Sequence, residues 1–328
     1  MKRSPATFLS GLVCSALWFF PNHAVAEEIA TTTKPQSTEA GGQPGAVTQP
    51  LDEIAMVSRL RSVSETEAIA AARKLGETTP GTGYAALFDV LSLGVSPKVA
   101  AAALSALTAY RRAESLPLFE LYVRHRNPEL RKRALQGLSA LVLVPEVGAS
   151  SGGGNPGPAK KSGKAAKPVS APLAAPHEEL APKIVPLLLS ALGDTHAEVR
   201  AVAAETLGQR REKTAEPALI KLLLRKDSAA PSALGLVGGP ETARALGEMI
   251  GSVPNYLITQ TLGELLRRPD FGGEPVRTEV VKMLGKMPGD QPVDFLTDYL
   301  KATDGDKEMK ARPSRAEAQK IIEQRTAK

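Results

Sequence analysis

Apolar residues recur along most of the chain with the spacing of one buried face of an α-helix. A clear example begins shortly after Thr195, where apolar or small side chains follow the i, i+3, i+4, i+7, i+8 pattern: Val199, Val202, Ala203, Thr206 and Leu207. Ser96-Pro97 and Asn127-Pro128 each place a capping side chain before a proline, which predicts the start of a helix. The pattern therefore predicts an all-α chain.

Two further signals predict where helices begin and end. Three serines or threonines precede a glutamate by three residues and are expected to form capping boxes at helix starts: Ser64, Thr195 and Ser314. Leu-Gly pairs are expected to end helices, because glycine readily adopts the left-handed conformation that follows a helix.

The helical pattern repeats along the chain, with a leucine near the end of each copy: Leu75, Leu107, Leu138, Leu207, Leu234, Leu262 and Leu284. The first two steps are 32 and 31 residues, and the later steps of 27, 28 and 22 indicate that the repeat shortens. Without its terminal segments and one insertion the chain has 222 residues, or about 32 for each of seven units. We therefore predict about seven helix pairs.

Two segments lack this pattern and are rich in Gly, Pro and small polar residues. Residues 27–50 are expected to form a disordered spacer, and residues 147–176 a disordered insertion of Gly, Pro, Ala and Lys. An insertion of that length is tolerated in a repeat array, because it leaves from one turn between helices. The predicted organisation is a signal peptide (1–26), the spacer, a helical array (51–302) that contains the insertion, and a charged tail with a terminal helix (303–328).

Residues 1–26 have the order of parts found in an export signal. Lys2 and Arg3 precede an apolar stretch, and Ala24-Val25-Ala26 stands before Glu27, so cleavage is expected between Ala26 and Glu27. An uncleaved membrane anchor and a lipoprotein acylated at Cys14 are the alternatives. The apolar stretch of about 15 residues is shorter than the roughly 20 needed to span a bilayer. We expect an exported protein that is not integral to the membrane, periplasmic or, alternatively, secreted.

The stretch Asp194–Leu224 has a turn aspartate, the pair Val199-Arg200, a face of small residues, the pair Leu207-Gly208 and a following P-A-L-I-x-x-L helix. In these features it resembles bacterial HEAT repeats, of the short type also seen in bilin-lyase-related proteins. The resemblance implies an α-solenoid with an extended concave surface. A tetratricopeptide array is the alternative, but that pattern uses a tryptophan, and the single Trp18 lies in the signal segment.

Composition and charge narrow the chemistry. The chain has 42% hydrophobic but only 4% aromatic residues, and its single cysteine, Cys14, is lost with the signal, which excludes cysteine catalysis and disulfides. The net charge of +6 divides into +2 in the signal, +4 in the insertion and zero elsewhere, so nucleic-acid binding is not expected. The basic residues of the insertion form a solvated linker or a weak electrostatic tether to an anionic envelope surface: Lys160, Lys161, Lys164 and Lys167.

Three arginines, Arg131, Arg200 and Arg277, recur at one position of the repeat. They form either a basic ladder that grips an acidic partner or, as we favour, structural contacts with acidic or carbonyl groups of neighbouring turns. The resemblance to HEAT repeats implies Asp–Arg ladders of the second kind, and Asp194 near Arg200 is the best example.

No motif for catalysis, a cofactor or a metal emerges. The remaining histidines lie too far apart in sequence for a zinc site and no acidic pair accompanies them: His125, His177 and His196. We therefore expect no cofactor, no metal and no enzyme activity. The expected function is an exported scaffold that holds a protein or peptide partner on the concave surface. A bilin-lyase-like enzyme and a nucleic-acid-binding HEAT-like protein are the alternatives.

Overall fold

The computed structural model describes residues 50–78, 81–143, 176–304 and 312–327, which belong to one unit of the chain. The signal segment with its expected cleavage site at Ala26 and Glu27 lies outside the described residues. So do residues 27–49 of the predicted spacer and the insertion lysines: Lys160, Lys161, Lys164 and Lys167.

Within the described residues the chain is built from α-helices and short 3-10 turns, without named strands. The helices form seven pairs. The first helices of the pairs are α1 Pro50–Leu60, α3 Thr82–Leu93, α5 Leu116–Val123, α7 Ala181–Ala191, α9 Glu216–Leu224, α11 Pro240–Glu248 and α13 Glu274–Lys286. The second helices are α2 Glu65–Gly76, α4 Pro97–Tyr110, α6 Pro128–Val142, α8 Ala197–Gln209, α10 Ala230–Val237, α12 Asn255–Arg267 and α14 Gln291–Ala302. A last helix, α16, spans Pro313–Thr326.

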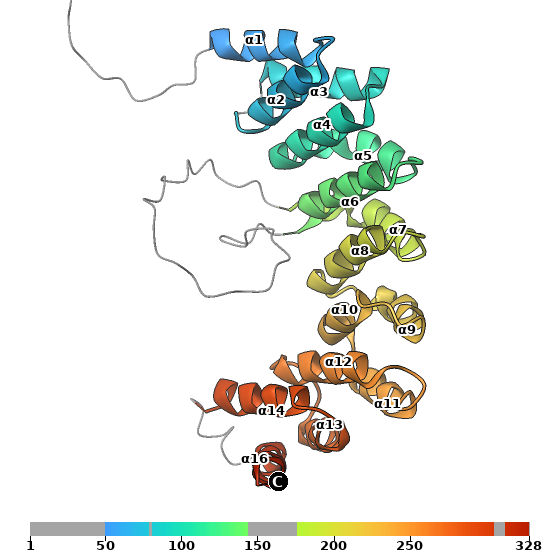
Figure 1. Cartoon of the computed structure of the whole chain (residues 1–328), viewed down its shortest axis with the longest axis vertical. Coiled ribbons are helices and arrows are strands. Elements are labelled where there is room, and N and C mark those ends of the chain that lie inside the picture. The colour runs from blue at the N-terminus through green and yellow to red at the C-terminus, as the bar shows by residue number, and fades with distance from the viewer. Residues whose placement is uncertain (1–49, 79–80, 144–175, 305–311, 328) are drawn as a thin grey trace, which may run out of the picture. The chain divides into compact units, whose positions relative to one another are not determined.

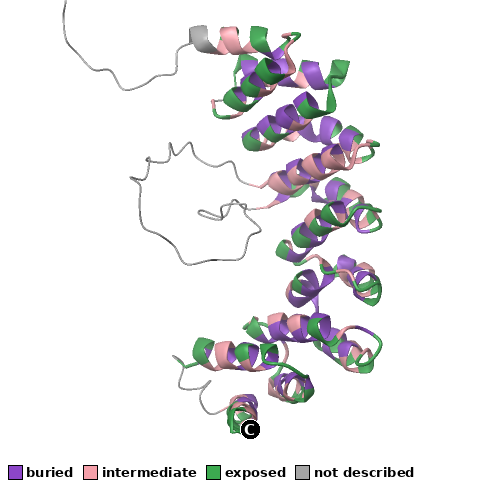
Figure 2. Ribbon diagram, in the orientation of Figure 1, coloured by how far each residue is buried: buried purple, intermediate pink, exposed green. Residues whose placement is uncertain are grey.

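Each second helix packs against its own first helix and against the second helices before and after it. The second helices thus form one continuous layer, seen as a column in Figure 1, and the first helices form the other. Buried residues lie where helices face each other, and one hydrophobic cluster extends from Leu60 to Ile321 (Figure 2). The predicted α-solenoid of about seven helix pairs is confirmed.

Three of the predicted N-cap residues are confirmed. Ser64, Ser96 and Asn127 are N-caps whose side chains accept an amide N–H of the first turn. The reciprocal half of the Ser64 capping box is missing, because the Ser64 amide donates to the Ser62 hydroxyl and not to Glu67. The capping boxes at Thr195 and Ser314 are wrong, because the helices begin two residues after Thr195 and one residue before Ser314. A capping side chain acts only at the boundary residue itself, so a displacement of one or two residues removes it.

The pair Leu93-Gly94 ends α3 with a glycine of positive φ, as predicted, but the glycines of Leu75-Gly76 and Leu207-Gly208 do not have positive φ, so these two pairs have another role. They mark close contacts between second helices. A Cβ atom at Gly76 would lie 2.8 Å from the Ala106 Cα atom, and one at Gly208 would lie 2.9 Å from the Ala233 Cα atom. Glycine is therefore needed there because the next helix backbone comes too near for any side chain.

The seventh unit differs from the prediction. Leu284 lies on α13, a first helix, whereas the other six leucines of the series lie on second helices. Its counterpart on a second helix is the fully buried Leu296 of α14, which is 34 residues after Leu262. The last repeat is therefore not shortened. The buried face of α13 produced the same leucine pattern as a second helix.

The C-terminal segment is not a tail beside the array. Helix α16 packs against α13 and α14 and buries Ala318 and Ile321. The Ser314 hydroxyl donates to Glu274 over 2.7 Å, and the Tyr299 and Ser314 hydroxyls are 2.8 Å apart. The chain after residue 312 thus covers the exposed side of the last pair.

Candidate functional site

The turns inside the helix pairs lie along one edge of the array, which we name the turn edge. Near its middle, Arg131 of α6 joins two successive turns. Its Nε and Nη2 atoms donate to the Asp194 carboxylate over 2.7 and 2.8 Å, and Nη1 donates to the carbonyls of His125 and Arg126 over 2.9 and 3.1 Å. Such a two-pronged contact fixes the geometry as well as the charge.

Arg200 of α8 makes the equivalent contact one unit later. Its guanidinium donates to the Asp227 carboxylate over 2.5 Å and to the carbonyls of Asp194 and Thr195 over 2.8 and 3.0 Å. The carboxylate of Asp194 thus pairs with Arg131 of the preceding unit, and Arg200 meets only its carbonyl. We name the Arg131–Asp194 and Arg200–Asp227 pairs the rungs of the turn edge.

The first rung changes the acidity of Asp194. Burial raises the pKa of this carboxyl, but the hydrogen bonds and charge of Arg131, together with the His196 amide, outweigh burial and lower the pKa from 3.8 to about 2. The Asp194 side chain is 12% exposed and that of Arg131 is 13% exposed. The rung is therefore a charged contact largely withdrawn from water.

Arg277 does not belong to this series. It lies on α13, a first helix, and is buried to 3% exposure. Its Nη2 atom donates to the carbonyls of Arg268 and Pro269 over 2.7 and 2.9 Å, which secures the connection between α12 and α13. Arg277 matched Arg131 and Arg200 in sequence only because the predicted seventh unit was aligned on Leu284, which lies on a first helix.

Each of the three histidines has a local partner, and the Arg131 guanidinium contacts both the His125 carbonyl and the His196 ring. His125 Nδ1 accepts the Asn127 amide over 3.0 Å, and His196 Nδ1 lies 3.0 Å from Arg131. His177 lies at the base of the insertion, where its amide donates to the Leu141 carbonyl over 2.7 Å. Among the described residues no group of three or more His, Cys, Asp or Glu side chains could hold a metal ion.

The base of the insertion is closed by two arginines. Arg111, which follows α4, donates to the Leu143 carbonyl, and Arg210, which follows α8, donates to the Val142 carbonyl over 2.8 Å and to Glu178 over 2.8 Å. The chain before residue 144 and the chain after residue 175 are thus joined to each other and to the neighbouring units.

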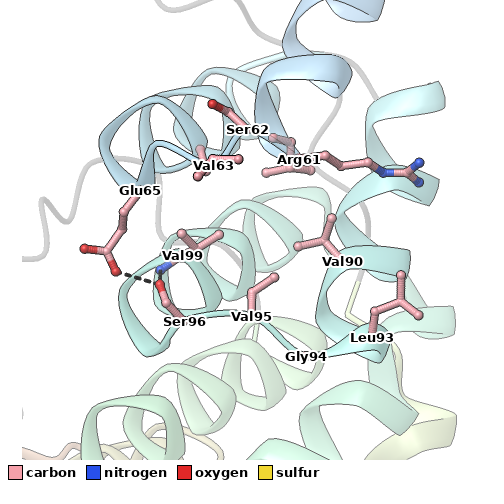
Figure 3. Close-up of a pocket in the computed structure, with 12 residues that line it drawn as sticks. Arg61, Ser62, Val63, Glu65, Val90, Leu93, Gly94, Val95, Ser96 and Val99 are labelled. Carbon is pink, nitrogen blue, oxygen red and sulfur yellow. Dashed lines mark hydrogen bonds between the residues drawn. The ribbon is translucent and has the colours of Figure 1, made fainter.

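A different arrangement occupies the turn edge between the first two pairs. There a cavity of about 460 Å³ opens to solvent, with Val63 of the first turn facing Val95 of the second turn and Val99 of α4 (Figure 3). The Ser96 hydroxyl donates to Glu65 over 2.6 Å at one end of the cavity. Val63 is fully exposed and Leu93 largely so, at 105% and 82% of the residue surface.

This cavity lies where a rung is missing. Ala68 and Gly94, which both line it, occupy the repeat positions of Arg131 and Asp194, seven and thirteen residues before the repeat leucine of their units. Both members of the rung are replaced by small residues.

A second hollow lies on the solvent-exposed side of the second-helix layer, across α2, α4 and α6. We name it the groove; its volume is about 620 Å³. Its charged lining residues are Arg73, Lys98, Glu129 and Arg133, and its lining also includes Ala101, Ala102 and Ser105. The prediction of a net charge of zero outside the signal and the insertion overlooked the groove, although aligning the repeats on Leu75, Leu107 and Leu138 would have placed these residues on one face.

Comparison with known proteins identifies the repeat. Residues 185–261 match the family of HEAT repeats. This stretch of the chain therefore consists of HEAT repeats. No curated protein matches the chain.

Several solved structures are similar to the chain at low identity. One is the complex of CpcE and CpcF of phycocyanin lyase from Nostoc sp. PCC7120, at 15% identity and a TM-score of 0.40, covering 88% of this chain and 99% of that one. Another is a designed armadillo repeat protein, at 17% identity and a TM-score of 0.27, covering 82% and 98%. An engineered protein matches at 17% identity and a TM-score of 0.40, covering 83% and 67%. No helix in the part of the chain that the structure describes is both long and apolar enough to cross a membrane.

Proposed function

We propose that this protein is an exported, non-enzymatic scaffold that holds a protein or peptide partner on its second-helix layer. This layer is the surface that we expect to be concave. The observation that carries the proposal is the groove, because it runs across three consecutive second helices and opens to solvent. Helices pack about 8–10 Å apart, so three of them offer about 20 Å, the length of roughly six residues of extended chain.

The experiment compares two tryptophan substitutions on α4. Ser105 lines the groove, whereas Ala109 is equally exposed one turn later and does not line it. Cross-linking of the full chain in envelope fractions, followed by affinity purification, should recover a stoichiometric partner. We expect Ser105→Trp to lower that recovery at least about tenfold and Ala109→Trp to leave it unchanged. Failure of the unsubstituted chain to recover a partner would contradict the scaffold.

Export rests on residues 1–26 and has its own test. We expect N-terminal sequencing of the mature protein to begin at Glu27, after cleavage behind Ala26. A protein that retains Met1 and fractionates with membranes would instead support the anchor. If the insertion lysines form a tether, changing all four to glutamine should weaken association with the envelope: Lys160, Lys161, Lys164 and Lys167.

The bilin-lyase alternative makes an optical prediction. A lyase-like site would change the absorbance spectrum of a linear tetrapyrrole added to the protein. We expect the spectrum to stay that of the free pigment at all protein concentrations. A saturable spectral shift would overturn the non-enzymatic proposal in favour of the lyase.

A further inference from the structure

The charge of the second-helix layer changes along the chain. Helices α2, α4 and α6 carry six basic and three acidic residues, whereas α8, α10, α12 and α14 together carry three basic and five acidic residues. The net charge outside the signal and the insertion is zero, but the first part of the second-helix layer, α2, α4 and α6, is positive. The groove lies in that part.

Within the described residues, the cations of the groove are incompletely neutralised. Arg73 makes no hydrogen bond or ion pair there, and Lys98, whose side chain is 77% exposed, meets Glu65 at 3.3 Å. Arg133 donates to Glu129 over 2.9 Å, but Lys132 also meets Glu129, at 2.8 Å. The one carboxylate that lines the groove is thus shared between two cations, and Arg73 has capacity for a further anion.

The residues that line the groove between these cations have small side chains, and none of them is aromatic. Ala101, Ala102 and Ser105 are the lining residues of α4 beyond its first turn, so a backbone can approach this helix closely. Bases of single-stranded nucleic acid need aromatic faces on which to stack, and the groove offers none. Small side chains flanked by ammonium and guanidinium groups suit an extended chain that carries carboxylates.

We propose that the groove binds an acidic, extended segment of the partner, whose carboxylates pair with Arg73, Lys98 and Arg133. The proposal rests on the scaffold function and specifies the chemistry of its partner. Carboxylates spaced along an extended chain can meet cations that stand on three successive helices. Arg73 receives its first ionic partner in this way, and Arg133 receives a second one.

The test measures fluorescence anisotropy of a labelled peptide of alternating glutamate and alanine against the full chain at low salt. We expect saturable binding that weakens as salt is added, and no binding of the same peptide with glutamine in place of glutamate. Arg73→Glu with Arg133→Glu should weaken binding at least about tenfold. The matched control reverses two exposed lysines of first helices, Lys183→Glu with Lys221→Glu, and should leave the affinity unchanged.

A single Arg73→Glu variant separates binding from folding, because among the described residues Arg73 contributes no ion pair to the fold. It should keep the urea midpoint of the unsubstituted chain and still lose several-fold in affinity. Equal binding by the Arg73/Arg133 variant and its control would overturn the proposal. So would binding of the glutamine peptide, or tighter binding of a single-stranded oligonucleotide.

The cross-linking experiment distinguishes this failure from failure of the scaffold. A partner that is recovered equally with and without Arg73→Glu and Arg133→Glu would leave the scaffold standing and overturn the acidic segment. If the glutamate peptide binds but no partner is recovered, the scaffold function is overturned, and the claim that the groove binds acidic segments stands.

Discussion

The turn edge is built in two ways along the same array. Between the third and fifth pairs it is closed by charged rungs, in which Arg131 and Arg200 join successive turns. Between the first and second pairs the equivalent positions are Ala68 and Gly94, and a solvent-exposed cavity takes the place of the rung. The leucine frame and the stacking of second helices are common to both regions.

The comparison teaches that the stacking of second helices and the closure of the turn edge are separate features of the repeat. Stacking depends on glycine and alanine where helices meet, and it continues through both regions. Closure depends on one long basic side chain and one aspartate in the next turn. Where both are small, the fold persists and the edge becomes available to other molecules.

Removing a rung should produce the largest loss of stability. Asp194→Ala leaves the Arg131 guanidinium, which is 13% exposed, without its carboxylate, so we expect the free energy of unfolding to fall by about 3 kcal/mol. In the first region Asp89→Ala removes a contact to Arg61 at 3.8 Å between side chains that are 60% exposed, and should cost less than about 0.5 kcal/mol. Urea denaturation measures both. Equal losses would remove the distinction between the regions.

Glycine positions should respond alike in the two regions. Gly76→Ala and Gly208→Ala each bring a Cβ atom within 3 Å of a neighbouring backbone, so we expect each to lower the free energy of unfolding by about 2 kcal/mol. Thermal denaturation followed by circular dichroism is suited to both. A large loss at one position with none at the other would show that stacking also differs between the regions.

Acid should weaken the middle region through Asp194. Its pKa is about 2 in the folded protein and 3.8 ordinarily, so the stabilisation is full above about pH 5 and is lost as the pH falls through 2. We expect stability to fall by about 1–2 kcal/mol less in Asp194→Asn than in the unsubstituted chain between pH 5 and 2. Urea titrations at both pH values provide the measurement. Parallel losses would assign the acid response to other carboxylates, such as Asp270, whose pKa is also about 2.

The exposed residues beside the cavity should have the smallest effect. Val63→Ser and Leu93→Ser replace residues that are already fully or largely exposed, so the free energy of unfolding should change by less than about 0.5 kcal/mol. Differential scanning calorimetry would measure this. A loss above about 1 kcal/mol would show that these side chains contribute to the core.

Helical periodicity predicted the fold because it records which residues face a neighbouring helix. The same signal misled at Leu284, since a first helix also buries one face and its apolar spacing does not say which layer it joins. Gly208 was interpreted as a helix end because glycine serves both at ends and at close contacts, and only the position of Ala233 distinguishes these roles.

The candidate site was less predictable than the fold. Arg131 and Asp194 could be singled out from the repeat, but their pairing depends on how far one unit is displaced from the next. The groove was not predicted, because a net charge of zero carries no information about where the individual charges lie. Arg73 and Arg133 belong to different helices and meet one hollow only after the second helices stack.

The hydrogen bond between His177 and Leu141 has a practical consequence for protein engineering. Because the chain departs after Leu143 and returns before His177 at one place, the length of what is spliced between them need not disturb the helices on either side. A fluorescent protein could replace residues 147–176 there as a reporter, far in sequence from both ends of the array. Its fluorescence would then report the location of the protein without a terminal tag.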